Sequence, residues 1–401
     1  MPTLLQINVT SNWGSTGKIA EQIGVLAQQS GWDSYIAYGR YANPSRLNTI
    51  KIGNIVDVYE HFIENRFFNR EGLASRKATK KFLKQIDEIN PDIVHLHNIH
   101  DHYLNYKLLF EYLAKKKIPV VWTQHDCWAF TGHCTHFDRI ICNKWIKDCD
   151  GCPQIKSFSL DRSKENYELK RSLFTSLSSL TLVPVSDWLG RLLKRSFLKE
   201  QSICVIKNGI DLDVFKQNNH IADIRTKYNL GKRKIIMGCA SVWTQSKGLA
   251  DFVKLRNLLP ILDYTILLVG LSKEQMSNLP EGIIGLERTN SLSELVELYS
   301  IADMFVNPTY SDTYPTTNLE ALACGTPVIT YMTGGSPESV DEKTGIVVEQ
   351  GNINALANAI VGMTKDLSIS EACRKRAEDY FDNKKCFERY INLYNSILRK
   401  D

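Results

Sequence analysis

The sequence lacks any long apolar run. No stretch of its 401 residues approaches the ~18 consecutive apolar residues of a membrane span, and residues 1–17 contain no basic region followed by a long apolar core. We therefore predict neither a membrane helix nor a secretory leader, and expect a cytoplasmic protein with reduced thiols. The 10 cysteines are too dilute for a small disulfide scaffold, and no repeat with a period of roughly 20 to 50 residues is visible.

Two glycine motifs that bind phosphate are also missing. The sequence has no GxGxxG run, which disfavours a dehydrogenase. The loop 10–18 is rich in glycine, but the GxxxxGK[ST] motif would need glycine at Asn12 and a hydroxyl residue at Ile19. ATP hydrolysis is therefore disfavoured as well.

Positive and negative charges are nearly equal in number over the whole chain, but they are unevenly distributed along the sequence. Lys+Arg number 49 against 44 for Asp+Glu, a net charge of +5. The segment 66–84 contains seven basic residues and one acid, which gives it a charge of +6. Its cations recur at helical spacing with apolar residues between them, as in a helix that lies on anionic lipid or phosphate. We predict peripheral membrane contact through 66–84, with a solvated helix face as the alternative.

Short apolar runs rich in β-branched residues recur in two series. The first series is 4–9, 34–39, 92–97, 119–125 and 180–186, and the second is 202–209, 234–241, 264–270, 304–308 and 327–331. Buried parallel strands have this pattern, so we predict two α/β units in tandem. We expect domains over 1–195 and 196–375, with a helical tail over 376–401 that packs back on the first. Ligands of such sheets bind beyond the carboxyl ends of the strands.

The most informative stretch is 311–338, in which Asp312 and Glu320 are separated by seven residues. Pro315 suits the first turn of a helix and Gly325 can end it. One carboxylate then precedes the helix and the other lies on it, beside amides that can hold an anion. Acceptor groups next to an anion site suit a ligand with hydroxyls and phosphates, such as a sugar nucleotide. The alternative is a capped helix whose acids face solvent.

This stretch resembles the acid-x7-acid signature of the retaining glycosyltransferase family 4, the group 1 glycosyltransferases, whose fold is the two-Rossmann GT-B architecture. The run Glu-Ala-Leu-Ala-Cys-Gly-Thr-Pro-Val at 320–328 matches closely. Two residues depart from the family's pattern. Asp312 occupies a position where the family usually has glutamate. Pro315 occupies a position where the family often has glycine, and proline has no backbone N–H to donate. The resemblance implies that Asp312 holds hydroxyls of the donor sugar and that Glu320 holds the ribose. The amides implied near sugar and phosphate are those of Tyr314, Thr316 and Thr317.

Other loops of the second domain resemble the same family. Lys247 follows the strand 234–241, as a phosphate-binding lysine does in the family, and the resemblance makes it a diphosphate contact. The arginine often found before that lysine is absent. Residues 334–338 resemble the loop that follows the next strand, where glycines permit close backbone approach.

In the first domain the resemblance covers two loops. The family's Gly-rich loop approaches the donor diphosphate and the acceptor, which assigns Gly14, Ser15 and Gly17 to donor binding. His125, at the tip of a strand, resembles the family's active-site histidine, which could hydrogen-bond the donor sugar or stabilise charge at its anomeric carbon.

A histidine-rich run, 95–102, precedes His125. His95 and His97 alternate on a strand, and no acid lies at ligand spacing. We interpret them as satisfied buried imidazoles rather than as a metal site. Asn98 and His100 are predicted to line the acceptor cleft.

Four cysteines of an insert over 127–153 could close a tetrahedral zinc site: Cys134, Cys142, Cys149 and Cys152. A site with four cysteine ligands has no open position, so zinc would be structural. His133 and His136 are spare candidate ligands. Redox chemistry is disfavoured because no strand leads into a helix at the CxxC pair, and disulfides because the compartment is reducing. The insert resembles one in group 1 glycosyltransferases of polysaccharide gene clusters.

The sequence is therefore interpreted as a retaining GT-B glycosyltransferase. We expect sugar transfer from a UDP- or GDP-sugar, bound by the second domain, to a glycan or lipid-linked glycan on the first, in capsule or lipopolysaccharide biosynthesis. The family implies catalysis without a metal ion, in which His125, Asp312, Glu320 and Lys247 hold charge and geometry. Two alternatives stay open. One is a catalytically silent GT-B scaffold, and the other is a zinc-bearing nucleic-acid-binding protein, which the nearly neutral remainder of the chain disfavours.

Overall fold

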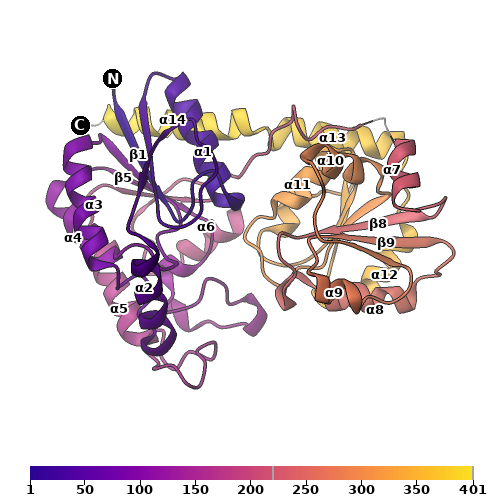
Figure 1. The fold of residues 1–401 in the computed structure, drawn as a ribbon, viewed down its shortest axis with the longest axis horizontal. Coiled ribbons are helices and arrows are strands. Elements are labelled where there is room, and N and C mark those ends of the chain that lie inside the picture. The colour runs from indigo at the N-terminus through magenta and orange to yellow at the C-terminus, as the bar shows by residue number, and fades with distance from the viewer. Residues whose placement is uncertain (219–220, 400–401) are drawn as a thin grey trace. The chain divides into compact units, whose positions relative to one another are not determined.

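The computed structural model describes residues 1–218 and 221–399, which form two α/β units (Figure 1). Unit 1 comprises Met1–Lys207 together with the segment from Phe387 onward, and unit 2 comprises Asn208–Cys386. Residues 400 and 401, the end of the predicted tail, lie outside the described residues. No helix in the described part of the chain is long and apolar enough to cross a membrane.

Unit 1 is built on a parallel sheet in the order β3-β2-β1-β4-β5-β6-β7. Its strands are β1 (Thr3–Asn8), β2 (Asp33–Tyr38), β3 (Asn48–Lys51), β4 (Ile93–Leu96), β5 (Val120–Gln124), β6 (Leu180–Pro184) and β7 (Ser202–Ile203). Its helices are α1 (Gly14–Gln29), α2 (Ile55–Phe68), α3 (Arg76–Ile89), α4 (Tyr106–Lys116), α5 (Ser163–Phe174) and α6 (Asp187–Leu193), with 3-10 turns at Trp128–Phe130, Asp138–Ile140 and Lys144–Ile146. Because the strand order reverses between β1 and β4, the carboxyl edge at these strands is where a ligand is expected.

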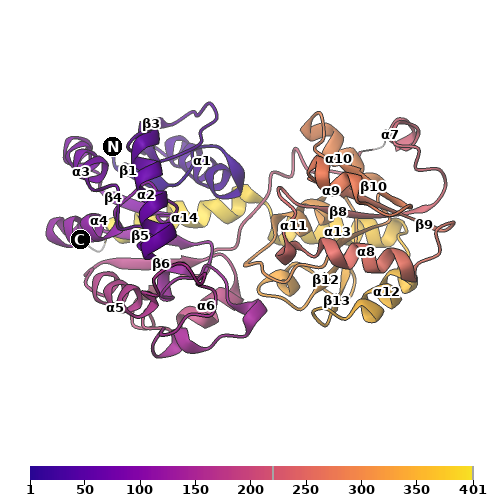
Figure 2. The same ribbon diagram turned by 60° about the horizontal axis from the view of Figure 1, so that its bottom comes forward.

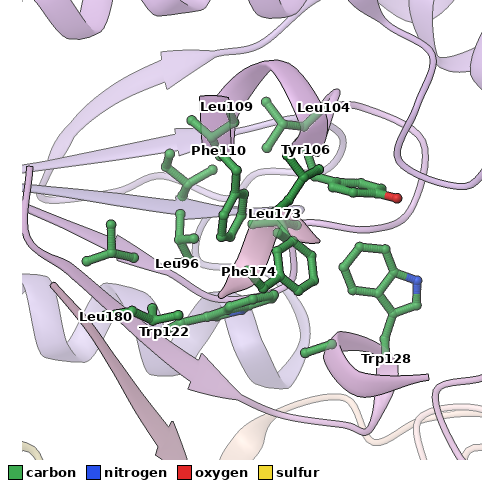
Figure 3. Close-up of a cluster of buried hydrophobic side chains, with 14 of the residues drawn as sticks. Leu96, Leu104, Tyr106, Leu109, Phe110, Trp122, Trp128, Leu173, Phe174 and Leu180 are labelled. Carbon is green, nitrogen blue, oxygen red and sulfur yellow. The ribbon is translucent and has the colours of Figure 1, made fainter. Parts of the chain in front are cut away.

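An aromatic cluster forms the centre of the unit 1 core (Figure 3). Phe110 of α4 and Phe174 of α5 have ring centroids 4.5 Å apart, and Phe174 lies edge-on to Trp122 of β5 at 4.9 Å. All three rings are buried. This packing fixes β5, and with it the loop that carries His125, against two helices.

Unit 2 is built on a second parallel sheet, in the order β10-β9-β8-β11-β12-β13. Its strands are β8 (Lys234–Cys239), β9 (Tyr264–Val269), β10 (Ile283–Leu286), β11 (Met304–Asn307), β12 (Val328–Tyr331) and β13 (Gly345–Val348). Its helices are α7 (Ile221–Lys227), α8 (Leu249–Leu258), α9 (Lys273–Ser277), α10 (Leu292–Ile301), α11 (Thr316–Ala323), α12 (Ile353–Gly362) and α13 (Leu367–Tyr380), with 3-10 turns at Gln245–Lys247 and Ser336–Ser339. The order reverses here between β8 and β11.

The strands that the sequence pattern missed or misplaced lie at the edges of the sheets. β3, β10 and β13 were not predicted, and β7 was predicted to begin the second series but pairs with β6 in the first sheet. Edge strands are short and partly exposed, so they lack the continuous apolar run by which buried parallel strands are recognised.

The prediction of a single amphipathic helix over 66–84 is wrong. α2 ends at Phe68, and α3 begins only at Arg76 after a turn in which Ser75 has a left-handed φ of 52°. Phe82 of α3 is 1% exposed and belongs to the core. The apolar face of α3 therefore packs inward, and its lysines face solvent, as in the alternative reading of a solvated helix face.

The last helix, α14 (Asn383–Leu398), contributes its residues from Phe387 onward to unit 1. The hydroxyl of Tyr390 lies 3.0 Å from Thr123 Oγ1, and that of Tyr394 lies 2.6 Å from His95 Nδ1. His95 also lies 2.8 Å from Thr123 through its Nε2. Both of its ring nitrogens have partners, so His95 is a satisfied buried imidazole as predicted.

Candidate functional site

The predicted donor-binding residues of unit 2 gather beyond the carboxyl ends of β8 and β11. Lys247 follows β8, Asp312 follows β11, and Lys247 Nζ lies 2.6 Å from Asp312 Oδ2. Both side chains are half-buried. The amide of Tyr310 donates to the Ser246 carbonyl at 2.7 Å, which joins the two loops. Lys247 is thus neutralised by Asp312, and a phosphate that binds this ammonium must compete with the carboxylate or share it.

Close backbone packing holds the Asp312 loop in place. Gly334 has a left-handed φ of 53°, and a Cβ atom there would lie 1.9 Å from the Asp312 carbonyl oxygen. The carboxylate of Asp312 accepts from the Tyr314 amide at 3.2 Å. A side chain at Gly334 would therefore displace the loop that carries one of the two predicted acids.

The second acid lies on α11, a helix whose first turn can receive an anion. No side chain caps its N-terminus, where Pro315 stands, and its first turn has no acid. Thr316 and Thr317 are half-buried there. Such a turn carries unpaired amides and a positive partial charge.

Glu320, one turn further along α11, accepts from Tyr299 Oη at 2.9 Å. Burial raises the pKa of Tyr299, and the carboxylate of Glu320 raises it further, so the phenol stays a donor. Tyr299 was missed in the sequence because an aromatic on an amphipathic helix carries no sign of a polar partner.

In unit 1 the predicted Gly-rich loop leads from β1 into α1. Gly14 opens the helix with φ 65°, and neither an acid nor a side-chain cap is present in the first turn. Gly14 and Ser15 are exposed. A Cβ atom on Gly17 would lie 2.6 Å from Thr10 Oγ1, so glycine lets this helix approach the loop. The local chemistry fits an anion at the N-terminus of α1.

His125 follows β5, and a chain of hydrogen bonds fixes its ring. Gln6 Nε2 donates to the Ala20 carbonyl at 2.8 Å, which leaves Gln6 Oε1 to accept from His97 Nε2 at 3.0 Å. His97 Nδ1 must then accept from His125 Nε2, 3.1 Å away. Burial lowers the pKa of His97 well below its usual range and that of His125 to about 4.

The ring of His125 is consequently neutral near pH 7, with its Nδ1 lone pair available. A neutral ring with this tautomer accepts a hydrogen bond from a sugar hydroxyl but supplies no positive charge. Gln6 and His97 were missed as positioning residues because their partners are far away in the sequence.

The next residue, Asp126, forms a partly buried ion pair with His100. His100 Nε2 lies 2.9 Å from Asp126 Oδ2, and Asp126 Oδ1 accepts from the Trp128 amide at 2.8 Å. Burial acts to lower the pKa of His100, but Asp126 outweighs it and raises the pKa to about 9. His100 is therefore charged and engaged with Asp126 at neutral pH, and it positions the loop behind His125. The backbone N–H of Asn98, the other acceptor candidate, donates a hydrogen bond to Asn8 Oδ1 at 3.2 Å.

The four insert cysteines line one small cavity in unit 1 together with Trp145 and His133. All four are free thiols, and burial raises the pKa of Cys134 to about 12 and of Cys149 to about 11. The structure brings them to one place, but within residues 1–218 and 221–399 no three histidine, cysteine or acidic side chains are arranged to hold a metal ion. The observed arrangement does not form a zinc site, and zinc stays a prediction.

Comparisons with known proteins agree with this architecture. Residues 19–214 match the family model described as Glycosyltransferase Family 4, and residues 220–380 match Glycosyl transferases group 1. The chain is 24% identical to the putative colanic acid biosynthesis glycosyl transferase WcaC of Escherichia coli, with 98% of this chain and 100% of that protein covered.

Two further similarities extend the comparison. The N,N'-diacetylbacillosaminyl-diphospho-undecaprenol alpha-1,3-N-acetylgalactosaminyltransferase of Campylobacter jejuni is 25% identical over 72% of this chain and 81% of its own length. The crystal structure of HepE from Anabaena in complex with UDP-glucose has a TM-score of 0.67 and 14% identity, covering 98% of this chain and 99% of that one. The chain belongs to the group 1 glycosyltransferases of glycosyltransferase family 4, and its two Rossmann-like units are those of the GT-B fold.

Proposed function

We propose that this glycosyltransferase moves a sugar, with retention, from a nucleotide-sugar to a glycan or lipid-linked glycan during synthesis of a cell-surface polysaccharide. The observation that carries the proposal is the Lys247–Asp312 pair beside the first turn of α11. It supplies one mobile cation, unpaired amides and an acceptor for hydroxyls at the edge of one sheet. The names of WcaC and of the Campylobacter enzyme, and the UDP-glucose bound to HepE, support the same class of substrates.

The donor would be held by unit 2. The diphosphate of the donor would bind the Lys247 ammonium and the backbone amides of Thr316 and Thr317. The backbone amide of Tyr314 would lie close to it. Asp312, released from Lys247, accepts hydroxyls of the sugar. Glu320, oriented by Tyr299, accepts from the ribose. The sequence predicts the donor domain as 196–375.

The acceptor would be held by unit 1, predicted as 1–195, and the resemblance to the family assigns Gly14, Ser15 and Gly17 of this unit to donor binding. The acceptor oxygen forms a bond to the anomeric carbon while the bond from that carbon to the phosphate oxygen breaks. The acceptor proton passes to the departing diphosphate, which leaves as the nucleoside diphosphate. His125 accepts from a sugar hydroxyl, and stabilisation is electrostatic, without a metal ion.

A test starts with the donor. Thermal unfolding of the whole chain with UDP-, GDP- and ADP-sugars identifies the nucleotide by its stabilisation, which follows the ratio of ligand concentration to Kd. The Glu320→Gln variant is expected to lose most of the stabilisation by the nucleotide-sugar and most of the sugar-transfer activity. Glu342→Gln, an exposed acid of the same unit, is the matched control. If none of the nucleotide-sugars stabilises the protein, the catalytically silent scaffold is favoured. If the protein binds nucleic acid and no nucleotide-sugar, the zinc-bearing nucleic-acid-binding protein is favoured.

The proposal has two further parts, which are a structural zinc ion bound by the four insert cysteines and a peripheral membrane contact through 66–84. The exposed cations Arg76, Lys77, Lys80 and Lys81 support a contact with anionic lipid. Metal analysis of purified protein tests the zinc, and less than one molar equivalent would count against it.

A further inference from the structure

Two aromatic side chains are exposed together at the carboxyl edge of the unit 1 sheet. Trp13, which follows β1, is 46% exposed, and Tyr41, which follows β2, is 51% exposed. Their ring centroids lie 4.8 Å apart, with the ring planes tilted by 35°. We call this pair the aromatic platform. Rings of this size are mostly buried in folded proteins, so an exposed pair indicates a binding surface.

Backbone hydrogen bonds hold the two loops of the platform together. The Ser11 amide donates to the Tyr41 carbonyl at 3.0 Å, and the Asn43 amide donates to the Ser11 carbonyl at the same distance. The Asn43 side chain donates to the Asn12 carbonyl at 2.8 Å. Asn12, directly before Trp13, has a left-handed φ of 48°, which is strained for a residue with a side chain. The backbone that carries both rings is therefore fixed before a ligand arrives, which reduces the entropy lost on binding.

An ion pair borders the platform. Arg40 Nη1 lies 2.9 Å from Asp101 Oδ1, and Arg40 Nη2 lies 3.4 Å from Tyr41 Oη. The guanidinium carbon of Arg40 lies 5.1 Å from the centroid of the Tyr41 ring. Both charged side chains are partly exposed. Because Asp101 neutralises Arg40, this border offers hydrogen-bond donors and acceptors without a net charge.

The platform lies on the same edge of the sheet as His125. Its loops follow β1 and β2, Asp101 lies in the loop after β4, and His125 follows β5. These strands are neighbours in the order β2-β1-β4-β5, and Figure 2 shows β1, β4 and β5 side by side, with α1 packed next to β1. Three strand spacings of ~4.8 Å separate β2 from β5, about 14 Å in all, which is the length of a short oligosaccharide.

We propose that the aromatic platform binds a pyranose ring of the acceptor glycan, away from the hydroxyl that receives the new sugar. One face of a pyranose presents C–H groups with a slight positive charge, which pack on the negative π face of an aromatic ring. Hydroxyls at the rim of the sugar would bond to Arg40 and Asp101. An anionic ligand is disfavoured because Arg40 is already paired. This assignment rests on the proposed function and adds the part of the acceptor that unit 1 would recognise.

Fluorine NMR of the whole chain labelled with fluorotryptophan measures the binding directly. The signal of Trp13, one of 7 tryptophans, is assigned by its absence in Trp13→Phe. The probes are oligosaccharides released by mild acid from the cell-surface polysaccharide of the source organism, and they are expected to shift the Trp13 signal as their concentration rises. No shift up to ~10 mM, which is above the usual range of KM, would overturn the proposal. A shift with free uridine or guanosine but not with the oligosaccharides would assign the rings to a base and overturn it as well.

Steady-state kinetics separate the platform from the donor site. With the same oligosaccharides as acceptors, Trp13→Ala and Tyr41→Ala are each expected to raise the acceptor KM roughly tenfold and to leave kcat unchanged, because the rings would bind the acceptor equally in the ground state and the transition state. Trp13→Phe keeps a ring face and is expected to restore most of the affinity. Tyr380→Ala, which changes an exposed tyrosine of unit 2, is the matched control.

Thermal unfolding with the nucleotide-sugar is measured for the same variants. The stabilisation is expected to stay at the wild-type value, which also verifies that the variants are folded. An unchanged acceptor KM in Trp13→Ala, or a loss confined to donor binding, would overturn the platform and leave the proposed sugar transfer intact. Failure of the wild type to bind any nucleotide-sugar would instead refute the proposed function, and the fluorine titration would still test the platform.

Discussion

The ion pair between His100 and Asp126 makes the stability of unit 1 depend on pH. The pKa of His100 is raised from 6.5 to about 9, with Asp126 at 2.9 Å and Glu71 at 3.9 Å as the facing acids. A raised pKa means that the folded state binds the proton more tightly than the unfolded chain. The contribution of protonated His100 to the free energy of unfolding is therefore fully present below pH 6.5 and is lost as the pH rises through about 9.

The magnitude follows from the shift. About 2.5 pKa units at ~1.4 kcal/mol each give about 3.5 kcal/mol of stability lost between pH 6.5 and a pH well above 9. His100→Gln removes this slope. It also leaves Asp126 without its cation, with the Trp128 amide as its remaining partner, so at pH 6.5 the variant is expected to be less stable by about 3–4 kcal/mol. The difference between wild type and variant then shrinks as the pH rises.

The assay is urea unfolding across pH 6 to about 10, followed by tryptophan fluorescence, because the Trp128 ring centroid lies 5.3 Å from that of His100. Hydrogen exchange of peptides over 97–131 assigns the transition to unit 1. His61→Gln is the matched control, since burial lowers the pKa of His61 to about 3 and its loss leaves the alkaline slope unchanged. Equal slopes above pH 7 in wild type and His100→Gln would refute the reasoning.

Three more results are expected. Gly334→Ala, which places a Cβ atom 1.9 Å from the Asp312 carbonyl, should lower stability by ~1–3 kcal/mol and reduce stabilisation by the donor in thermal unfolding. Tyr299→Phe removes the hydrogen bond to Glu320 and should raise KM for the donor about fivefold in steady-state kinetics, whereas an unchanged KM would exclude an orienting role. If zinc is bound, Cys134→Ser should lower the metal content measured by mass spectrometry, and a metal-free wild type would contradict the zinc hypothesis.

The fold class and the family could be predicted from the amino-acid sequence alone. Parallel strands buried on both faces produce apolar runs that can be read locally, and the run from Asp312 to Val328 keeps its acids and glycine at fixed spacing on one helix and its flanking loops. A local signal also marks the start of α10, where Ser291 is followed three residues later by Glu294 and the Ser291 side chain accepts from the Glu294 amide at 3.1 Å. Edge strands gave no such signal, because they are short and partly exposed.

The contacts between side chains that are distant in the sequence could not be predicted and are seen in the folded structure. Lys247 and Asp312 pair because parallel strands β8 and β11 end at the same edge, and His125 takes its tautomer from Gln6 through His97. Spacing along a chain does not encode such contacts, since they depend on sheet order and on the direction of each strand. For the same reason the basic segment 66–84 looked amphipathic in sequence, whereas folding buries the apolar face of α3 and exposes that of α2.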